Sequence, residues 1–197
     1  MEQEPPYINS RLTVPNVITM IRILATPLFV IFLLQGVYDR AMIIFVLAGL
    51  SDLIDGYIAR NFKQKSPLGA HLDPLADKLL ITSSFLVLGY FHKVPAWLAI
   101  IVISRDIVIV GGIIALKLFD VTVRIEPARV SKWATAFQIF TVFLAILGEL
   151  WPYPRWVLVG CGWVTAYFTV ASGIHYLMRG LRLLNEHGKK TADLGQS

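Results

Sequence analysis

Long apolar runs separated by short polar breaks dominate the sequence. A membrane-spanning helix needs about 20 apolar residues, and six runs approach or exceed that length: 15–36, 41–60, 72–92, 95–118, 132–150 and 154–178. The breaks carry Pro, Gly or charged residues, which is typical of turns between helices. The runs are apolar on all sides, as in a membrane span or in the core of a large protein. We therefore predict an all-α, polytopic integral membrane protein with six transmembrane helices.

The composition favours the membrane over the core of a large protein. Of the 197 residues, 56% are hydrophobic and only 16% are charged, whereas about a quarter are charged in soluble domains. So little polar sequence could not cover several apolar helices. No internal repeat is visible, and the only cysteine, Cys161, excludes a disulfide framework. We expect a single domain over 1–197, with an N-terminal segment at 1–13 and a polar C-terminal tail at 183–197.

The basic residues predict the topology. Six spans place both termini on one side of the membrane, and that side receives most of the Lys and Arg residues. The opposite side receives only Arg40, Lys93 and Arg155, so the termini are expected to be cytoplasmic. The net charge of +5 lies beside apolar runs, which favours anionic lipid headgroups over nucleic acid as its partner. No cleavable signal peptide is evident, and we expect a bacterial inner membrane protein.

Four aspartates are gathered in the stretch "SDLIDGYIARNFKQKSPLGAHLDPLADK", residues 51–78. Asp52 and Asp55 are three positions apart, and Asp73 and Asp77 are four positions apart. Each pair therefore shares one face of a helix. The connection between the second and third runs is short, so these helices are expected to be antiparallel neighbours. The two carboxylate pairs can then converge at the cytoplasmic side.

Converging carboxylates repel one another, and their desolvation costs several kcal/mol each when they are unpaired. A cation must offset this cost, and carboxylate oxygens suit hard ions such as Mg²⁺ or Mn²⁺. His71 is read as a packing residue, and no Cys or His cluster argues for zinc. Three small residues, Gly56, Ala59 and Gly69, lie at helical positions in the same stretch. They would let a ligand approach the backbone closely. Alternatively, they would only let membrane helices pack together.

The spacing D-x2-D-G-x2-A-R-x8-G-x3-D-x3-D strongly resembles the motif of the CDP-alcohol phosphatidyltransferases. It is met by Asp52, Asp55, Gly56, Ala59, Arg60, Gly69, Asp73 and Asp77. The stretch "VPNVITMIR" is similar to the start of the family's first helix, and six helices are the family's plan. The resemblance implies transfer of a phosphatidyl group from CDP-diacylglycerol to an alcohol, with release of CMP.

The resemblance also implies roles for these residues. Asp52, Asp55 and Asp73 would bind two Mg²⁺ or Mn²⁺ ions, and Asp77 would bridge to the second ion and act as general base. The cytidine nucleotide would contact Asp52, Gly56, Ala59, Arg60 and Gly69. The alternatives are a structural cation site, a polar network that pairs helices, and an ion-coupled transporter. Metal-dependent release of CMP distinguishes the transferase from these alternatives.

The acceptor is read from weaker signals. Arg105 lies inside the fourth run, where an ionisable residue is a functional candidate, although an Arg105–Asp106 pair could instead stabilise a helix interface. Arg129 and Lys132 could hold an acceptor phosphate or be ordinary positive-inside charge.

Three further segments, "SRDIVIVGG", "IEPARVSKWATAFQ" and "VTAYFTVASGIHY", resemble the CDP-diacylglycerol-using cardiolipin synthases, whose acceptor is phosphatidylglycerol. Phosphatidylglycerophosphate synthases share Lys132, Thr135 and Gln138, so glycerol 3-phosphate is the alternative acceptor. The lack of an arginine in "GGII" weakens that alternative, and inositol phosphate or serine ranks third. A homodimer stays open, because the small residues Ala48, Gly49 and Ser51 could pack an interface.

Overall fold

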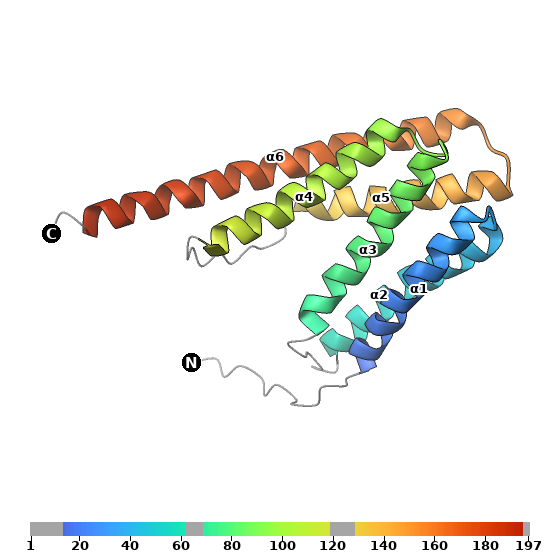
Figure 1. The fold of residues 1–197 in the computed structure, drawn as a ribbon, viewed down its shortest axis with the longest axis horizontal. Helices are drawn as coiled ribbons and strands as arrows, with labels where there is room; N and C mark the ends of the chain where they lie inside the picture. The colour runs from blue at the N-terminus through green and yellow to red at the C-terminus, as the bar shows by residue number, and fades with distance from the viewer. Residues whose placement is uncertain (1–13, 62–68, 119–128, 195–197) are drawn as a thin grey trace. The chain divides into compact units, whose positions relative to one another are not determined.

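The structure, a computed structural model, describes the backbone of residues 14–61, 69–118 and 129–194. Side chains are described for residues 16–52, 75–113, 116 and 130–183. All secondary structure in these residues is α-helical (Figure 1). The helices are α1 (Val14–Leu34), α2 (Tyr38–Asn61), α3 (Gly69–Tyr90), α4 (Ala96–Leu118), α5 (Arg129–Leu150) and α6 (Arg155–Leu194). The predicted all-α class is confirmed for this part of the chain.

Each predicted apolar run coincides with one helix, and the largest difference is at the end of α6. The apolar run was expected to end at residue 178, but α6 continues to Leu194. The added segment, residues 179–194, contains four Leu, two Arg and two Lys residues, which are good helix formers, and it contains no proline. The polar tail expected from residue 183 is therefore helical over most of its length.

Four of the described helices are long and apolar enough to cross a membrane. They contain the segments Asn16–Leu34, Ala96–Ile113, Val130–Leu150 and Arg155–Leu183. Large apolar side chains on these segments face outward: Leu24 is 76% exposed and Ile107 is 66% exposed. Soluble monomers rarely present such extensive apolar surface. The chain is therefore a helical membrane protein, whereas six spans and cytoplasmic termini remain predictions.

The described helices fall into two compact units, and the first consists of residues up to Lys93 together with Val142–Tyr153. Within it, α1 packs against both α2 and α3. Phe29 of α1 and Phe45 of α2 are buried, and their ring centroids lie 5.8 Å apart. Lys93, which follows the end of α3, donates from Nζ to Glu149 Oε2 at 2.6 Å. Glu149 lies in the last turn of α5.

A tight turn reverses the chain between α1 and α2 in this unit. Gly36 has a φ of 72°, a left-handed conformation that glycine adopts without steric cost. The Gly36 N–H donates to the Leu33 carbonyl at 3.2 Å, and the Val37 N–H donates to the Phe32 carbonyl at 2.9 Å. This pair of bonds is a Schellman motif, which satisfies the last carbonyls of α1. The turn makes α1 and α2 antiparallel neighbours.

The second unit contains Val94–Thr141 and the chain from Pro154 onward. In it α4 packs against α6, and a buried polar seam joins α5 to α6. Gln138 Nε2 donates to Thr169 Oγ1 at 3.1 Å, and the hydroxyls of Thr141 and Thr165 lie 2.7 Å apart. Such polar contacts between helices are typical of membrane proteins. The single domain predicted for residues 1–197 stays a prediction.

Candidate active site

One buried arginine joins the two helices that carry the aspartate motif. Arg22 Nη1 donates to Asp52 Oδ1 on α2 at 2.9 Å and to Asp77 Oδ1 on α3 at 2.6 Å. The Arg22 side chain is 1% exposed, whereas the Asp52 and Asp77 side chains are 40% and 38% exposed. The first unit therefore brings one carboxylate from each predicted pair to the same guanidinium, and both carboxylates remain accessible.

Arg22 belongs to a buried polar stripe on α1. Asn16, Thr19, Arg22 and Thr26 are each at most 7% exposed, and their spacing of three or four places them on one helix face. The Thr26 hydroxyl donates to the Arg22 carbonyl at 2.9 Å, so this hydroxyl has a hydrogen-bond partner within the apolar helix. The sequence interpretation counted Arg22 only among the positive-inside charges. The spacing of four polar residues in an otherwise apolar run was the signal that could have identified it.

The charges at this site fit a bound cation. Two carboxylates contact one guanidinium, so these three side chains carry one negative charge in excess. Carboxylate oxygens are the ligands that Mg²⁺ and Mn²⁺ prefer, and the Asp52 and Asp77 carboxylates are both partly exposed. Among the described side chains, no cluster of three or more Asp, Glu, His or Cys residues forms. A complete ligand set would therefore require the remaining motif aspartates.

The other motif residues lie on the backbone of the same two helices. Asp55, Gly56, Ala59 and Arg60 belong to the last turns of α2, and Gly69 and Asp73 belong to the start of α3. Their side chains, and that of His71, are outside the described residues. The predicted roles of these residues in metal and CDP binding stay predictions.

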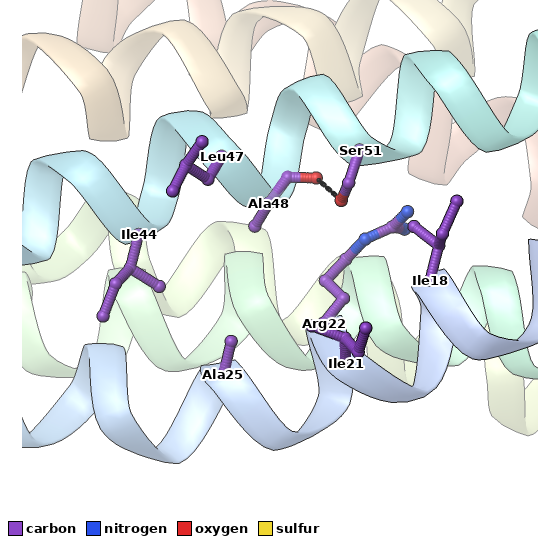
Figure 2. A pocket seen from close by; sticks show the side chains of 8 residues that line it. All are labelled: Ile18, Ile21, Arg22, Ala25, Ile44, Leu47, Ala48 and Ser51. Atoms are coloured by element: carbon purple, nitrogen blue, oxygen red, sulfur yellow. Dashed lines mark hydrogen bonds between the residues drawn. The ribbon is translucent and has the colours of Figure 1, made fainter.

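A cavity of about 400 Å³ lies between α1 and α2, and Arg22 lies beside it (Figure 2). Its lining is otherwise almost entirely apolar: Ile18, Ile21, Ala25, Ile44, Leu47, Ala48 and Ser51 complete it. Ser51, the residue before Asp52, donates its hydroxyl to the Ala48 carbonyl at 2.8 Å. The cavity therefore has an apolar stretch and a polar end next to the gathered carboxylates.

Arg105, a candidate acceptor residue, is buried in the second unit and is 8% exposed. Its Nη1 donates to Asp106 Oδ1 at 2.7 Å, and its Nη2 donates to the hydroxyls of Ser131 at 2.6 Å and Ser172 at 3.0 Å. One guanidinium thus links α4, α5 and α6. Its Nε has no hydrogen-bond partner among the described residues. The sequence interpretation anticipated the Asp106 pair but missed both serines.

The other two candidate acceptor residues lie at the start of α5. Lys132 is exposed and follows Ser131, one of the hydrogen-bond partners of Arg105. Arg129 is the first residue of α5, and its side chain is outside the described residues. The second unit therefore places a cationic side chain close in sequence to the buried Arg105 cluster.

Comparisons with known proteins identify the family of this chain. Residues 12–171 match the family model described as CDP-alcohol phosphatidyltransferase. A human relative named "Cardiolipin synthase (CMP-forming)" is 33% identical over 193 residues, covering 89% of this chain and 64% of the relative. A Rattus norvegicus protein of the same name is 35% identical over 185 residues, covering 85% of this chain and 61% of the relative.

A bacterial relative has a different name. The Bacillus subtilis protein named "CDP-diacylglycerol--glycerol-3-phosphate 3-phosphatidyltransferase" is 32% identical over 187 residues, covering 86% of this chain and 96% of that protein. The chain thus spans slightly less than two thirds of the mammalian relatives and nearly all of the bacterial one. The matched range, residues 12–171, contains Arg22, the whole aspartate motif and Arg105. The chain belongs to the CDP-alcohol phosphatidyltransferase family, a family of transferases.

Proposed function

We propose that this protein transfers a phosphatidyl group from CDP-diacylglycerol to an alcohol and releases CMP. The observation that carries the proposal is the convergence of Asp52 and Asp77 on the buried Arg22. It joins the two halves of the family motif at one accessible site. The family match over residues 12–171 supports the same activity.

In this proposal the donor diphosphate binds at the aspartate motif. Asp52, Asp55, Asp73 and Asp77 would hold two Mg²⁺ or Mn²⁺ ions, and Gly56, Ala59, Arg60 and Gly69 would contact the cytidine nucleotide together with Asp52. Bound divalent cations would stabilise the negative charge that develops on the diphosphate during displacement. Arg22 would hold Asp52 and Asp77 in place, because a planar guanidinium with five donors fixes the carboxylates that it contacts.

Asp77 would act as general base toward the acceptor. Its carboxylate would take the proton of the acceptor hydroxyl as the hydroxyl oxygen attacks the phosphorus of the phosphatidyl group. A new P–O bond forms, the P–O bond to CMP breaks, and CMP leaves. General-base catalysis by a positioned side chain typically contributes 10²–10⁴-fold. The hydrogen bond from Arg22 at 2.6 Å would fix the orientation of this base.

Phosphatidylglycerol is the proposed acceptor, with glycerol 3-phosphate as the alternative. Either molecule carries a phosphate anion that Arg105, Arg129 and Lys132 could recognise. One donor of the buried Arg105 guanidinium, Nε, is not used by any described residue. The relatives divide between the two activities, because the mammalian ones are named cardiolipin synthase and the Bacillus subtilis one is named for glycerol 3-phosphate.

The proposed topology has six membrane-crossing helices with both termini in the cytoplasm. At 1.5 Å per residue, the 24 residues of α2 and the 22 residues of α3 reach about 36 and 33 Å, enough for a hydrocarbon core of about 30 Å. The excess of Lys and Arg on the side of the termini supports this orientation. The aspartate motif would then face the cytoplasm, across a bacterial inner membrane. A homodimer remains one option for the assembly.

The acceptor is tested with the purified full-length chain in lipid vesicles that contain CDP-diacylglycerol and Mg²⁺ or Mn²⁺. Phosphatidylglycerol, glycerol 3-phosphate and inositol phosphate are supplied separately, and CMP and the lipid product are quantified. We expect cardiolipin from phosphatidylglycerol at the highest rate. Product formed only from glycerol 3-phosphate would assign the alternative acceptor, and absence of CMP with every acceptor would reject the proposed function. Lys132→Gln should raise the KM for the acceptor without changing the KM for the donor.

A further inference from the structure

The cavity between α1 and α2 has the features of a site for a hydrocarbon chain. Its volume of about 400 Å³ lies within the range of small-molecule sites, about 300–1,000 Å³. Ile21 and Leu47, on opposite walls, are 59% and 60% exposed, so the cavity opens to the outer surface of the helix pair. Ala25 and Ala48 contribute only methyl groups, which leaves the space between the helices unfilled (Figure 2).

The direction of the cavity matches that of a lipid. Arg22 and Ser51 lie at one end, beside Ile18, and the apolar lining continues to Ala25 on α1 and Ile44 on α2 (Figure 2). From Ser51 to Ile44 the helix rises about 10 Å, away from the end of α2 that carries the motif and toward the Gly36 turn. A lipid with its headgroup at the motif would place its chain along this path, toward the interior of the bilayer.

The position of Arg22 and Ser51 indicates which lipid the cavity would bind. Arg22 contacts both Asp52 and Asp77, and Ser51 directly precedes Asp52 in the sequence. The donor diphosphate would lie at these carboxylates, so the glycerol backbone esterified to that diphosphate would be next to Arg22 and Ser51. We infer that the α1–α2 cavity binds one acyl chain of the CDP-diacylglycerol donor. This inference rests on the proposed function for the identity of the headgroup.

Filling the cavity tests the inference. Ala25→Leu adds a branched side chain inside it, whereas Gly49→Leu adds the same side chain on α2 where a new Cβ meets nothing within 4 Å. Gly49 does not line the cavity and is therefore the matched control. We expect Ala25→Leu to raise the KM for a dioleoyl donor on the order of tenfold, and to leave the KM for a dihexanoyl donor nearly unchanged. Gly49→Leu should change neither KM.

A second measurement does not depend on turnover. CDP-diacylglycerol with a diazirine halfway along one acyl chain is photolysed with the full-length protein in vesicles, and the labelled peptides are identified. We expect label on residues 18–25 and 44–51, removed by excess CDP-diacylglycerol but not by excess phosphatidylcholine, and reduced by Ala25→Leu. If Ala25→Leu prevents folding, the pair Leu47→Ala and Leu50→Ala replaces it, because both leucines are exposed on α2 and only Leu47 lines the cavity.

The outcomes separate this inference from the proposed function. Label elsewhere on a wild-type protein that releases CMP would overturn the acyl-chain site and keep the activity. Label that phosphatidylcholine competes equally would identify a bulk-lipid contact and also overturn the inference. A cavity closed by a second copy would give no label there and would likewise overturn it. Specific label on a wild-type protein that releases no CMP would support the acyl-chain site and reject the activity.

Discussion

Arg22 and Asp77 are 55 positions apart in the sequence, and Arg22 Nη1 donates to Asp77 Oδ1 at 2.6 Å. The same nitrogen donates to Asp52 at 2.9 Å. Two carboxylates that contact the same nitrogen repel one another, and the buried guanidinium offsets that repulsion. Arg22 therefore bridges α2 and α3 at the candidate active site.

Replacing Arg22 by Lys should lower the rate of CMP release by about 100-fold or more. The lysine ammonium is a compact charge on a flexible stem and cannot reproduce the planar fork of donors of arginine. Asp52 and Asp77 would then lose their fixed relative position, and a misplacement of about 1 Å can cost 10²-fold. The rate is measured with saturating CDP-diacylglycerol and acceptor.

Arg40→Lys is the matched control for Arg22→Lys. Arg40 is exposed near the start of α2, where its guanidinium lies 5.6 Å from the centre of the Phe32 ring. We expect this variant to retain wild-type turnover. Equal rates for Arg22→Lys and the wild-type protein would contradict the positioning role of Arg22.

Replacing Asp77 by Asn should strongly reduce the rate of transfer and leave the protein folded. The amide is nearly the same size as the carboxylate but cannot accept the acceptor proton, so a loss of about 10²–10⁴-fold is expected. Folding is monitored by circular dichroism and thermal unfolding. Asp39→Asn, at an exposed position in the first turn of α2, should keep its activity. Normal turnover by Asp77→Asn would rule out Asp77 as the general base.

Removal of divalent ions should eliminate activity and weaken donor binding. The excess of negative charge at Asp52 and Asp77 repels a diphosphate unless a cation neutralises it. Chelation with excess EDTA, followed by addition of Mg²⁺ or Mn²⁺, should abolish and then restore CMP release. Donor affinity is measured in parallel by titration. Undiminished activity in excess chelator would reject the two-metal proposal.

Removal of the Ser172 hydroxyl should destabilise the second unit. Ser172 Oγ accepts a 3.0 Å hydrogen bond from Arg105 Nη2, and Ser172→Ala should lower the free energy of unfolding by about 1 kcal/mol, the usual scale for one such bond. Ser104→Ala, at an exposed position on α4, should change it by less than about 0.5 kcal/mol. If Ser172→Ala instead raises only the KM for the acceptor, the cluster serves binding and not helix packing.

The sequence predicted the helices well because their signals are local. Long apolar runs ended by residues such as Gly36 and Pro95 mark helix boundaries without reference to the rest of the chain. The end of α6 could not be read in this way, since the residues after 178 lose their apolar character but keep high helix propensity. Hydrophobicity predicts where a helix enters a membrane and does not predict where the helix stops.

The candidate site was predicted only in part because its contacts are distant in the sequence. The spacing of the aspartates predicted that the second and third helices converge, and Asp52 and Asp77 both contact Arg22. The residue that joins them, Arg22, comes from the first helix, and a single arginine near a membrane surface has an ordinary explanation as a topology signal. The serines that bind Arg105 come from two other helices and have no local pattern that pairs them with it.

The most direct test of the central claim is release of CMP from CDP-diacylglycerol by the wild-type chain and by Asp52→Asn. We expect the wild-type protein to form CMP and a new phospholipid in equal amounts, only when an alcohol acceptor and a divalent cation are present. We expect Asp52→Asn to lower the rate at least about 100-fold, because the variant loses a residue that positions the reacting groups. No CMP from the wild-type protein under any of these conditions, or an unchanged rate in the variant, would contradict the proposed transfer at the Asp52–Asp77 site.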